Sequence, residues 1–144
     1  MSLFREIKSV LVILIAVIAP FFLIILEKTI LPYPVFIEEV TKALVVFFLI
    51  LQLPGRKLKI LAGLLFGFFF GLSENIFYLV NIIENGVIKI FWQRMFFVTP
   101  MHIITTLIIL LPTLKNRWFI IFGLAGAIIL HALFNSIVVD FLMQ

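Results

Sequence analysis

Most of this chain consists of long apolar segments, each close to the length that crosses a lipid bilayer. A transmembrane helix needs about 20 mostly apolar residues. Five such segments occur between polar or proline-containing breaks, at residues 9–26, 35–53, 60–83, 94–111 and 118–143. Hydrophobic residues make up 65% of the 144 residues, and a soluble domain of this size has too little interior to bury them. We therefore predict an all-α, polytopic integral membrane protein, with residues 1–144 forming one helical domain.

The composition also excludes several functional classes. It is too apolar for an ordinary soluble enzyme or a disordered chain, and no Lys/Arg-rich run with interleaved aromatics predicts a nucleic-acid surface. Without cysteine there is no thiolate nucleophile and no cysteine-ligated metal. The second segment is the most charged, so a four-span alternative would omit it. Residues 87–93 are predicted to form a separate interfacial turn of helix.

Basic residues predict the orientation of the bundle. They gather before the first segment, between the second and third, and between the fourth and fifth. They are Arg5, Lys8, Arg56, Lys57, Lys59, Lys115 and Arg117. The positive-inside rule then places the N-terminus in the cytoplasm and the C-terminus outside, in a multi-pass protein of the cell membrane.

Ionisable side chains within the apolar segments are the most informative residues, because each costs at least ~2.5–3.5 kcal/mol to insert. They are Glu38, Glu39, Lys42, Glu74, His102 and His131, with Arg94 at a segment edge. The polar but uncharged Asn135 follows one turn after the last histidine. At ~1.5 Å rise per residue, the interior groups lie roughly 6–17 Å from the outer ends of their segments. We therefore predict one shared site in the outer half of the membrane.

Helical spacing supports this convergence. Glu38 and Lys42 are four residues apart on one helix face, and Glu39 lies about 100° around the helix from Glu38. Small residues precede Glu74 and His131 at four-residue spacing (Gly63, Gly67 and Gly71; Gly123 and Ala127). Such stripes allow close helix packing, which would direct both polar groups into the bundle. Carboxylates beside imidazoles in a partly dry cavity suit general acid–base activation of water, and two histidines with a carboxylate also suit zinc.

Four short motifs, in order along the chain, resemble those of the PrsW family of intramembrane proteases. Residues 38–42 (EEVTK) resemble its E-E-x-x-K motif, and residues 70–75 (FGLSEN) its F-x-x-x-E-N motif. Arg94 and His102 resemble its R-x7-H motif, and residues 131–135 (HALFN) its H-x-x-x-[ND] motif. This family is related to the CAAX-processing and bacteriocin-processing group, which has E-E-x-x-x-R and a histidine at the position of Glu74.

The resemblance implies an endopeptidase that cleaves membrane-anchored proteins or peptides, such as anti-sigma factors. By position, Glu38 and Glu39 would activate water, His102 and His131 would orient water or bind metal, and Glu74 would be a second acid or a ligand. Asn135 would stabilise the oxyanion, with Lys42, Asn75 and Arg94 in support. Two alternatives stay open for the cofactor: zinc held by His102, His131 and Glu74, or a metal-free glutamate mechanism. Because members of this family are expected to be longer, the resemblance also leaves open a partner protein or self-association into a homo-oligomer to complete the cavity.

Two other functions use the same residues. A small proton-coupled transporter would use the Glu/His set as a relay, but it needs polar groups along a whole pore, and the inner half here is nearly all apolar. An inactive scaffold would keep the fold and bind transmembrane helices through the glycine stripe. The sequence alone separates this scaffold poorly from a protease.

Overall fold

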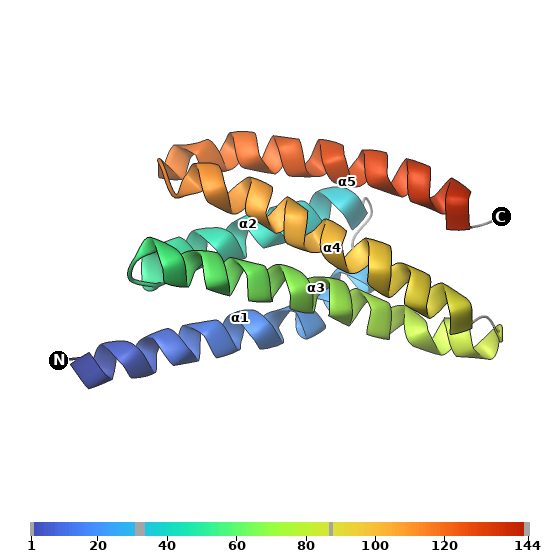
Figure 1. Cartoon of the computed structure of the whole chain (residues 1–144), viewed down its shortest axis with the longest axis horizontal. Helices are drawn as coiled ribbons and strands as arrows, with labels where there is room; N and C mark the ends of the chain where they lie inside the picture. Colours follow the sequence, from blue (N-terminus) through green and yellow to red (C-terminus); the bar gives the residue numbers. More distant parts are fainter. Residues whose placement is uncertain (1, 31–33, 87, 143–144) are drawn as a thin grey trace.

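The computed structural model describes residues 2–30, 34–86 and 88–142. Within these ranges the chain is helical, with no strand, as predicted. The elements are α1 (Ser2–Ile30), α2 (Pro34–Gln52), α3 (Arg56–Glu84), α4 (Ile88–Thr113), the 3-10 turn η1 (Arg117–Phe119) and α5 (Ile120–Leu142). The helices run side by side along one long axis, and the start of α1 and the end of α5 lie at opposite ends of the bundle (Figure 1).

Four helical segments in the described part of the chain are long and apolar enough to cross a membrane. They are Phe4–Ile25, Arg56–Glu84, Ile88–Thr113 and Arg117–Val138. The prediction of a polytopic membrane protein is thereby supported. The remaining helix, α2, is not among them and carries three charged side chains, Glu38, Glu39 and Lys42. The count of five spans and the orientation stay predictions.

The helix boundaries differ most from the predicted segments at α1, which begins seven residues before and ends four residues after the predicted 9–26, and at α4. The separate interfacial turn predicted at residues 87–93 is wrong for residues 88–93, which form the first turns of α4; Val87 lies outside the described residues. No proline or glycine separates Ile88 from Arg94, so the backbone hydrogen bonds of the helix continue without a break. The helix also continues through Pro100 and Pro112 to Thr113. At the last predicted segment, α5 ends at Leu142, and residue 143 is outside the described residues.

The glycines of α3 bring α4 close, as their spacing predicted. A Cβ atom added to Gly67 would lie 2.8 Å from the Cα of Ile103, and one added to Gly71 would lie 2.7 Å from the Cα of Thr99. Both distances are shorter than van der Waals contact, so only glycine permits this backbone approach. Gly123 likewise permits a close backbone approach between α5 and α4. These contacts place the polar faces of α3, α4 and α5 against one another.

Apolar side chains fill the bundle towards the C-terminal half of α2 and the N-terminal half of α3. One cluster joins α1, α2 and α3, and includes Val12, Ala16, Leu49, Ala62 and Phe66. A second joins α2, α4 and α5. The ionisable groups of α2 lie at its other end, within its first three turns. The bundle therefore has an apolar half and a half that buries charged groups.

Candidate active site

Four helices bury ionisable side chains at one place in the bundle. Glu38, Glu39, Lys42, His102 and His131 are each at most 3% exposed, and Glu74 is 8% exposed. Unpaired burial of so many charged groups would be strongly destabilising. Their contacts form two clusters that meet at Glu38.

The first group, here called the lysine cluster, consists of Glu39 and Lys42 of α2, Thr105 of α4 and His131 of α5. The Nζ of Lys42 donates to Glu39 Oε1 at 2.6 Å and to Thr105 Oγ1 at 2.9 Å. The Nδ1 of His131 lies 2.6 Å from the same carboxylate oxygen. Because a carboxylate only accepts hydrogen bonds, Nδ1 is the donor, and in the neutral imidazole Nε2 keeps its lone pair. The cluster thus sets the orientation of His131.

The second group, the arginine cluster, consists of Glu74 of α3 with Arg94 and His102 of α4. Arg94 Nη2 donates to Glu74 Oε1 at 3.2 Å, and His102 Nε2 lies 2.6 Å from Glu74 Oε2. The Arg94 and Glu74 side chains are 21% and 11% exposed. The carboxylate of Glu74 therefore connects a partly exposed cation to a buried histidine.

Glu38 joins the two clusters. Its Oε2 lies 3.7 Å from His131 Nε2, and it offers a carboxylate oxygen within 4.8 Å of ligand atoms of both Glu74 and His102. The rings of His102 and His131 are nearly perpendicular, with centroids 5.4 Å apart. Three carboxylates and two histidines, distributed over four helices, thus form one network. The predicted shared site corresponds to this network.

The donor set of Glu38, Glu74 and His102 fits a metal such as zinc, which takes carboxylate oxygen and imidazole nitrogen. The predicted set had His131 where the structure places Glu38; His131 is not part of this group. Among the described residues, Glu39 Oε2 and His102 Nδ1 are buried without a hydrogen-bond partner. Unsatisfied buried polar atoms are costly, so they suit a site that takes up water or substrate.

The two asparagines of the predicted site differ in their surroundings. The Nδ2 of Asn75, which is fully buried, donates to Thr99 Oγ1 at 3.1 Å and so fastens α3 to α4. Asn135 is half-buried on α5, and within the described part of the chain no hydrogen bond or charged partner is found for its side chain. A role for Asn135 as an oxyanion donor stays a prediction.

Two aromatic residues contribute to the site without having been predicted to do so. The Phe70 ring lies under Lys42, with Nζ 4.9 Å from its centroid, and 5.1 Å from the His102 ring. Tyr78 stacks against Arg94, whose Cζ is 4.5 Å from the ring centroid. Each is four residues from Glu74, so the helical period that places Glu74 in the bundle was the signal that could have found them.

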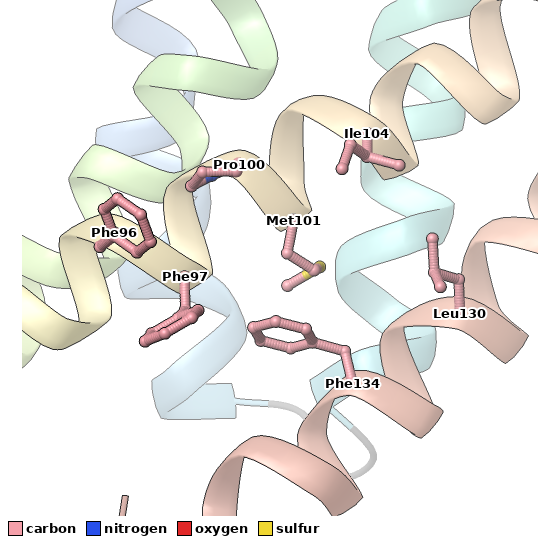
Figure 2. Close-up of a pocket in the computed structure, with 7 residues that line it drawn as sticks. All are labelled: Phe96, Phe97, Pro100, Met101, Ile104, Leu130 and Phe134. Carbon is pink, nitrogen blue, oxygen red and sulfur yellow. The ribbon is translucent and has the colours of Figure 1, made fainter. Parts of the chain in front are cut away.

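An apolar pocket of about 180 Å³ opens between α4 and α5 next to the site. It is lined by Phe96, Phe97, Pro100, Met101, Ile104, Leu130 and Phe134 (Figure 2). Met101 directly precedes His102, and Leu130 directly precedes His131. A large apolar side chain in this pocket would therefore lie beside the helix turns that carry both histidines.

The fold and the site together define a helical membrane protein with a buried carboxylate–histidine centre. The sequence matches the PrsW family intramembrane metalloproteases over residues 9–144, nearly the whole chain. The chain belongs to this family, and the resemblance seen in its motifs is confirmed. No curated protein and no solved structure matches the chain.

Proposed function

We propose that this protein is an intramembrane endopeptidase that hydrolyses peptide bonds of membrane-anchored substrates with a water activated in the buried network. The observation that carries the proposal is the convergence of Glu38, Glu74 and His102, whose ligand atoms all lie within 4.8 Å of one another, with His131 Nε2 3.7 Å from Glu38 Oε2. The apolar clusters at the other end of the bundle favour a dead-end cavity over a transport path.

The two adjacent glutamates of α2 take different parts in this proposal. Glu39 is bonded to Lys42 and to Nδ1 of His131, so it acts as a positioning residue for the histidine. Glu38 lies where the two clusters meet, and in the metal-free reaction it is the residue we propose as general base, taking a proton from the attacking water. His131 Nε2, held towards Glu38, is placed to orient that water or to pass the proton to the leaving amine. Asn135, one helical turn further along α5, is proposed as the donor to the oxyanion.

Glu38, Glu74 and His102 are the residues that would hold a zinc ion, since their donor atoms suit it. A metal bound there would act as a Lewis acid on the scissile carbonyl. The same carboxylates can serve a metal-free reaction, in which Glu74 and His102 share a proton across their 2.6 Å contact.

The substrate class follows from the surroundings of the site. The pocket next to both histidines is lined by apolar side chains, which suits a large apolar residue of a membrane-anchored protein or peptide. Anti-sigma factors are the example that the motif resemblance implies. We further propose a cell-membrane location, an N-terminus in the cytoplasm, a site in the outer half of the bilayer and self-association into a homo-oligomer.

A reconstituted cleavage assay on a single-span substrate tests the proposal. Glu38→Gln removes the base while keeping the side-chain shape, and should lower the cleavage rate at least about 10²-fold, the usual contribution of general acid–base catalysis. Glu84→Gln, at the exposed end of α3, is the matched control and should cleave like the wild type. Full activity of folded Glu38→Gln would contradict the assignment.

The same assay with and without a chelator separates the two cofactor alternatives. Loss of cleavage that added zinc restores, together with metal bound to the purified protein, supports the metal centre. Cleavage unaffected by the chelator in a metal-free sample supports the glutamate mechanism. If the wild type cleaves no membrane-anchored peptide under any of these conditions, the scaffold alternative replaces the proposal.

A further inference from the structure

A groove at the end of α3 and the start of α4 leads from the bundle surface to the arginine cluster. Its volume is about 300 Å³, and it is lined by Tyr78, Asn81, Ile82, Asn85, Ile90 and Arg94. At about 30 Å³ per liquid water, this is room for several molecules. Four of the six lining residues carry polar groups, in contrast to the apolar pocket between α4 and α5.

The polar residues of α3 form one line towards the site. Glu74, Tyr78, Asn81 and Asn85 are separated by four, three and four residues, which places them on one helix face. Asn81 and Asn85 are exposed, Tyr78 is half-buried and Glu74 is buried. The line therefore runs from the helix end into the bundle with decreasing exposure.

Arg94 is the contact between the groove and the site. Its side chain lines the groove, stacks on Tyr78 and donates to Glu74 Oε1 at 3.2 Å. The remaining ionisable side chains of the site (Glu38, Glu39, Lys42, His102 and His131) are at most 3% exposed. Glu74 is thus the carboxylate of the site with the greatest exposure, and it lies on the groove side.

We propose that this groove is the route by which water reaches Glu74 and His102, with the Arg94 guanidinium at its inner end. Hydrolysis consumes one water per bond cleaved, and a site within apolar helices needs a polar path to supply it. The amides of Asn81 and Asn85 and the guanidinium offer the hydrogen-bond partners that ordered water requires. This inference rests on the proposed hydrolytic function, but its main test does not require cleavage.

Cysteine labelling tests the route directly, because the chain has no cysteine of its own. Tyr78→Cys and Val80→Cys lie two residues apart on α3, at similar depth but on opposite faces. Val80 is 61% exposed on the bundle surface and is not among the groove-lining residues. In proteoliposomes, a charged methanethiosulfonate should label Tyr78→Cys at least about tenfold faster than Val80→Cys, because thiolates form in water and not in an apolar environment. Equal or slower labelling of Tyr78→Cys would overturn the route.

A blocking variant connects the route to catalysis. Asn81→Trp should fill the groove and slow cleavage at least tenfold, whereas Ile83→Trp, a substitution of similar bulk at a surface position 61% exposed, should not. Circular dichroism checks that both variants are folded. If the wild type cleaves but the labelling rates are equal, the route alone fails. If labelling follows the expectation while the wild type does not cleave, the route stands and the hydrolytic function fails.

Discussion

The lysine cluster and the arginine cluster contain similar groups in different surroundings. In the lysine cluster, Glu39 and Lys42 have fully buried side chains 2.6 Å apart. In the arginine cluster, the Glu74 and Arg94 side chains keep 11% and 21% of their surface exposed and lie 3.2 Å apart. The comparison separates two tasks: a closed ion pair that holds three helices in place, and an open one beside a groove that exchanges with solvent.

The difference follows from where each pair sits. Lys42 of α2 lies over the Phe70 ring of α3 and against Thr105 of α4, where neighbouring side chains exclude water. Arg94 lies in the second turn of α4, near the polar end of α3. Buried pairs depend strongly on both partners, whereas pairs near solvent contribute little to stability. The clusters should therefore respond differently to mutation.

The largest effect on stability is expected at Lys42. Lys42→Met removes the buried partner of Glu39 and should lower the free energy of unfolding by about 3–5 kcal/mol. Unfolding by sodium dodecyl sulfate in mixed micelles, followed by circular dichroism, measures the change. Lys89→Met, at an exposed position, should unfold like the wild type. If the two variants unfold alike, the ion pair between Lys42 and Glu39 does not have the structural role we describe.

A large effect on activity with a smaller one on stability is expected at Glu74. Glu74→Gln keeps the shape of the side chain but cannot exchange a proton with His102, so cleavage should fall at least about 10²-fold. Its unfolding midpoint should stay closer to the wild type than that of Lys42→Met, because solvent reaches the arginine cluster. If Glu74→Gln cleaves like the wild type but is less stable, the arginine cluster has a structural role, as the lysine cluster does.

The next largest effect on stability is expected from a change in the packing between α3 and α4 near the arginine cluster. Gly71→Ala places a Cβ atom 2.7 Å from the Thr99 Cα and 3.3 Å from His102 Cδ2. Overpacking of this kind costs about 1–3 kcal/mol, and it should also slow cleavage by moving His102. Gly126→Ala is the matched control, since among the described residues its added Cβ comes within 4 Å of Ile108 Cγ2 alone, at an ordinary contact distance of 3.4 Å. Equal unfolding midpoints for the two variants would show that α3 and α4 tolerate a wider separation.

The smallest effect on stability is expected at Arg94. Arg94→Gln breaks a pair that is partly exposed, and such pairs contribute about 0–1 kcal/mol. The unfolding midpoint in mixed micelles should therefore barely change. A loss as large as that of Lys42→Met would show that the arginine cluster is as closed as the lysine cluster.

Much of the site could be predicted from the sequence, because charged residues in apolar segments are costly and few. Glu38, Glu39, Glu74, His102 and His131 were all expected in one site, and the structure brings them together. The glycine stripe of α3 likewise indicated close packing, since only small residues allow it. The prediction of a separate interfacial turn is wrong for residues 88–93, because hydrophobic periodicity does not show where one helix ends and the next begins.

The sequence by itself determined that the chain is a bundle of apolar helices, which helix faces are polar, and which family it belongs to. These features depend on composition, helical period and short motifs. Only the tertiary structure decided that Lys42 pairs with Glu39, that Glu38 offers a carboxylate oxygen within 4.8 Å of ligand atoms of Glu74 and His102, and that Tyr78 and Arg94 share a groove. Most of these contacts join residues of different helices. Which side chains meet depends on how closely and at what rotation the helices pack, and the local sequence does not encode this.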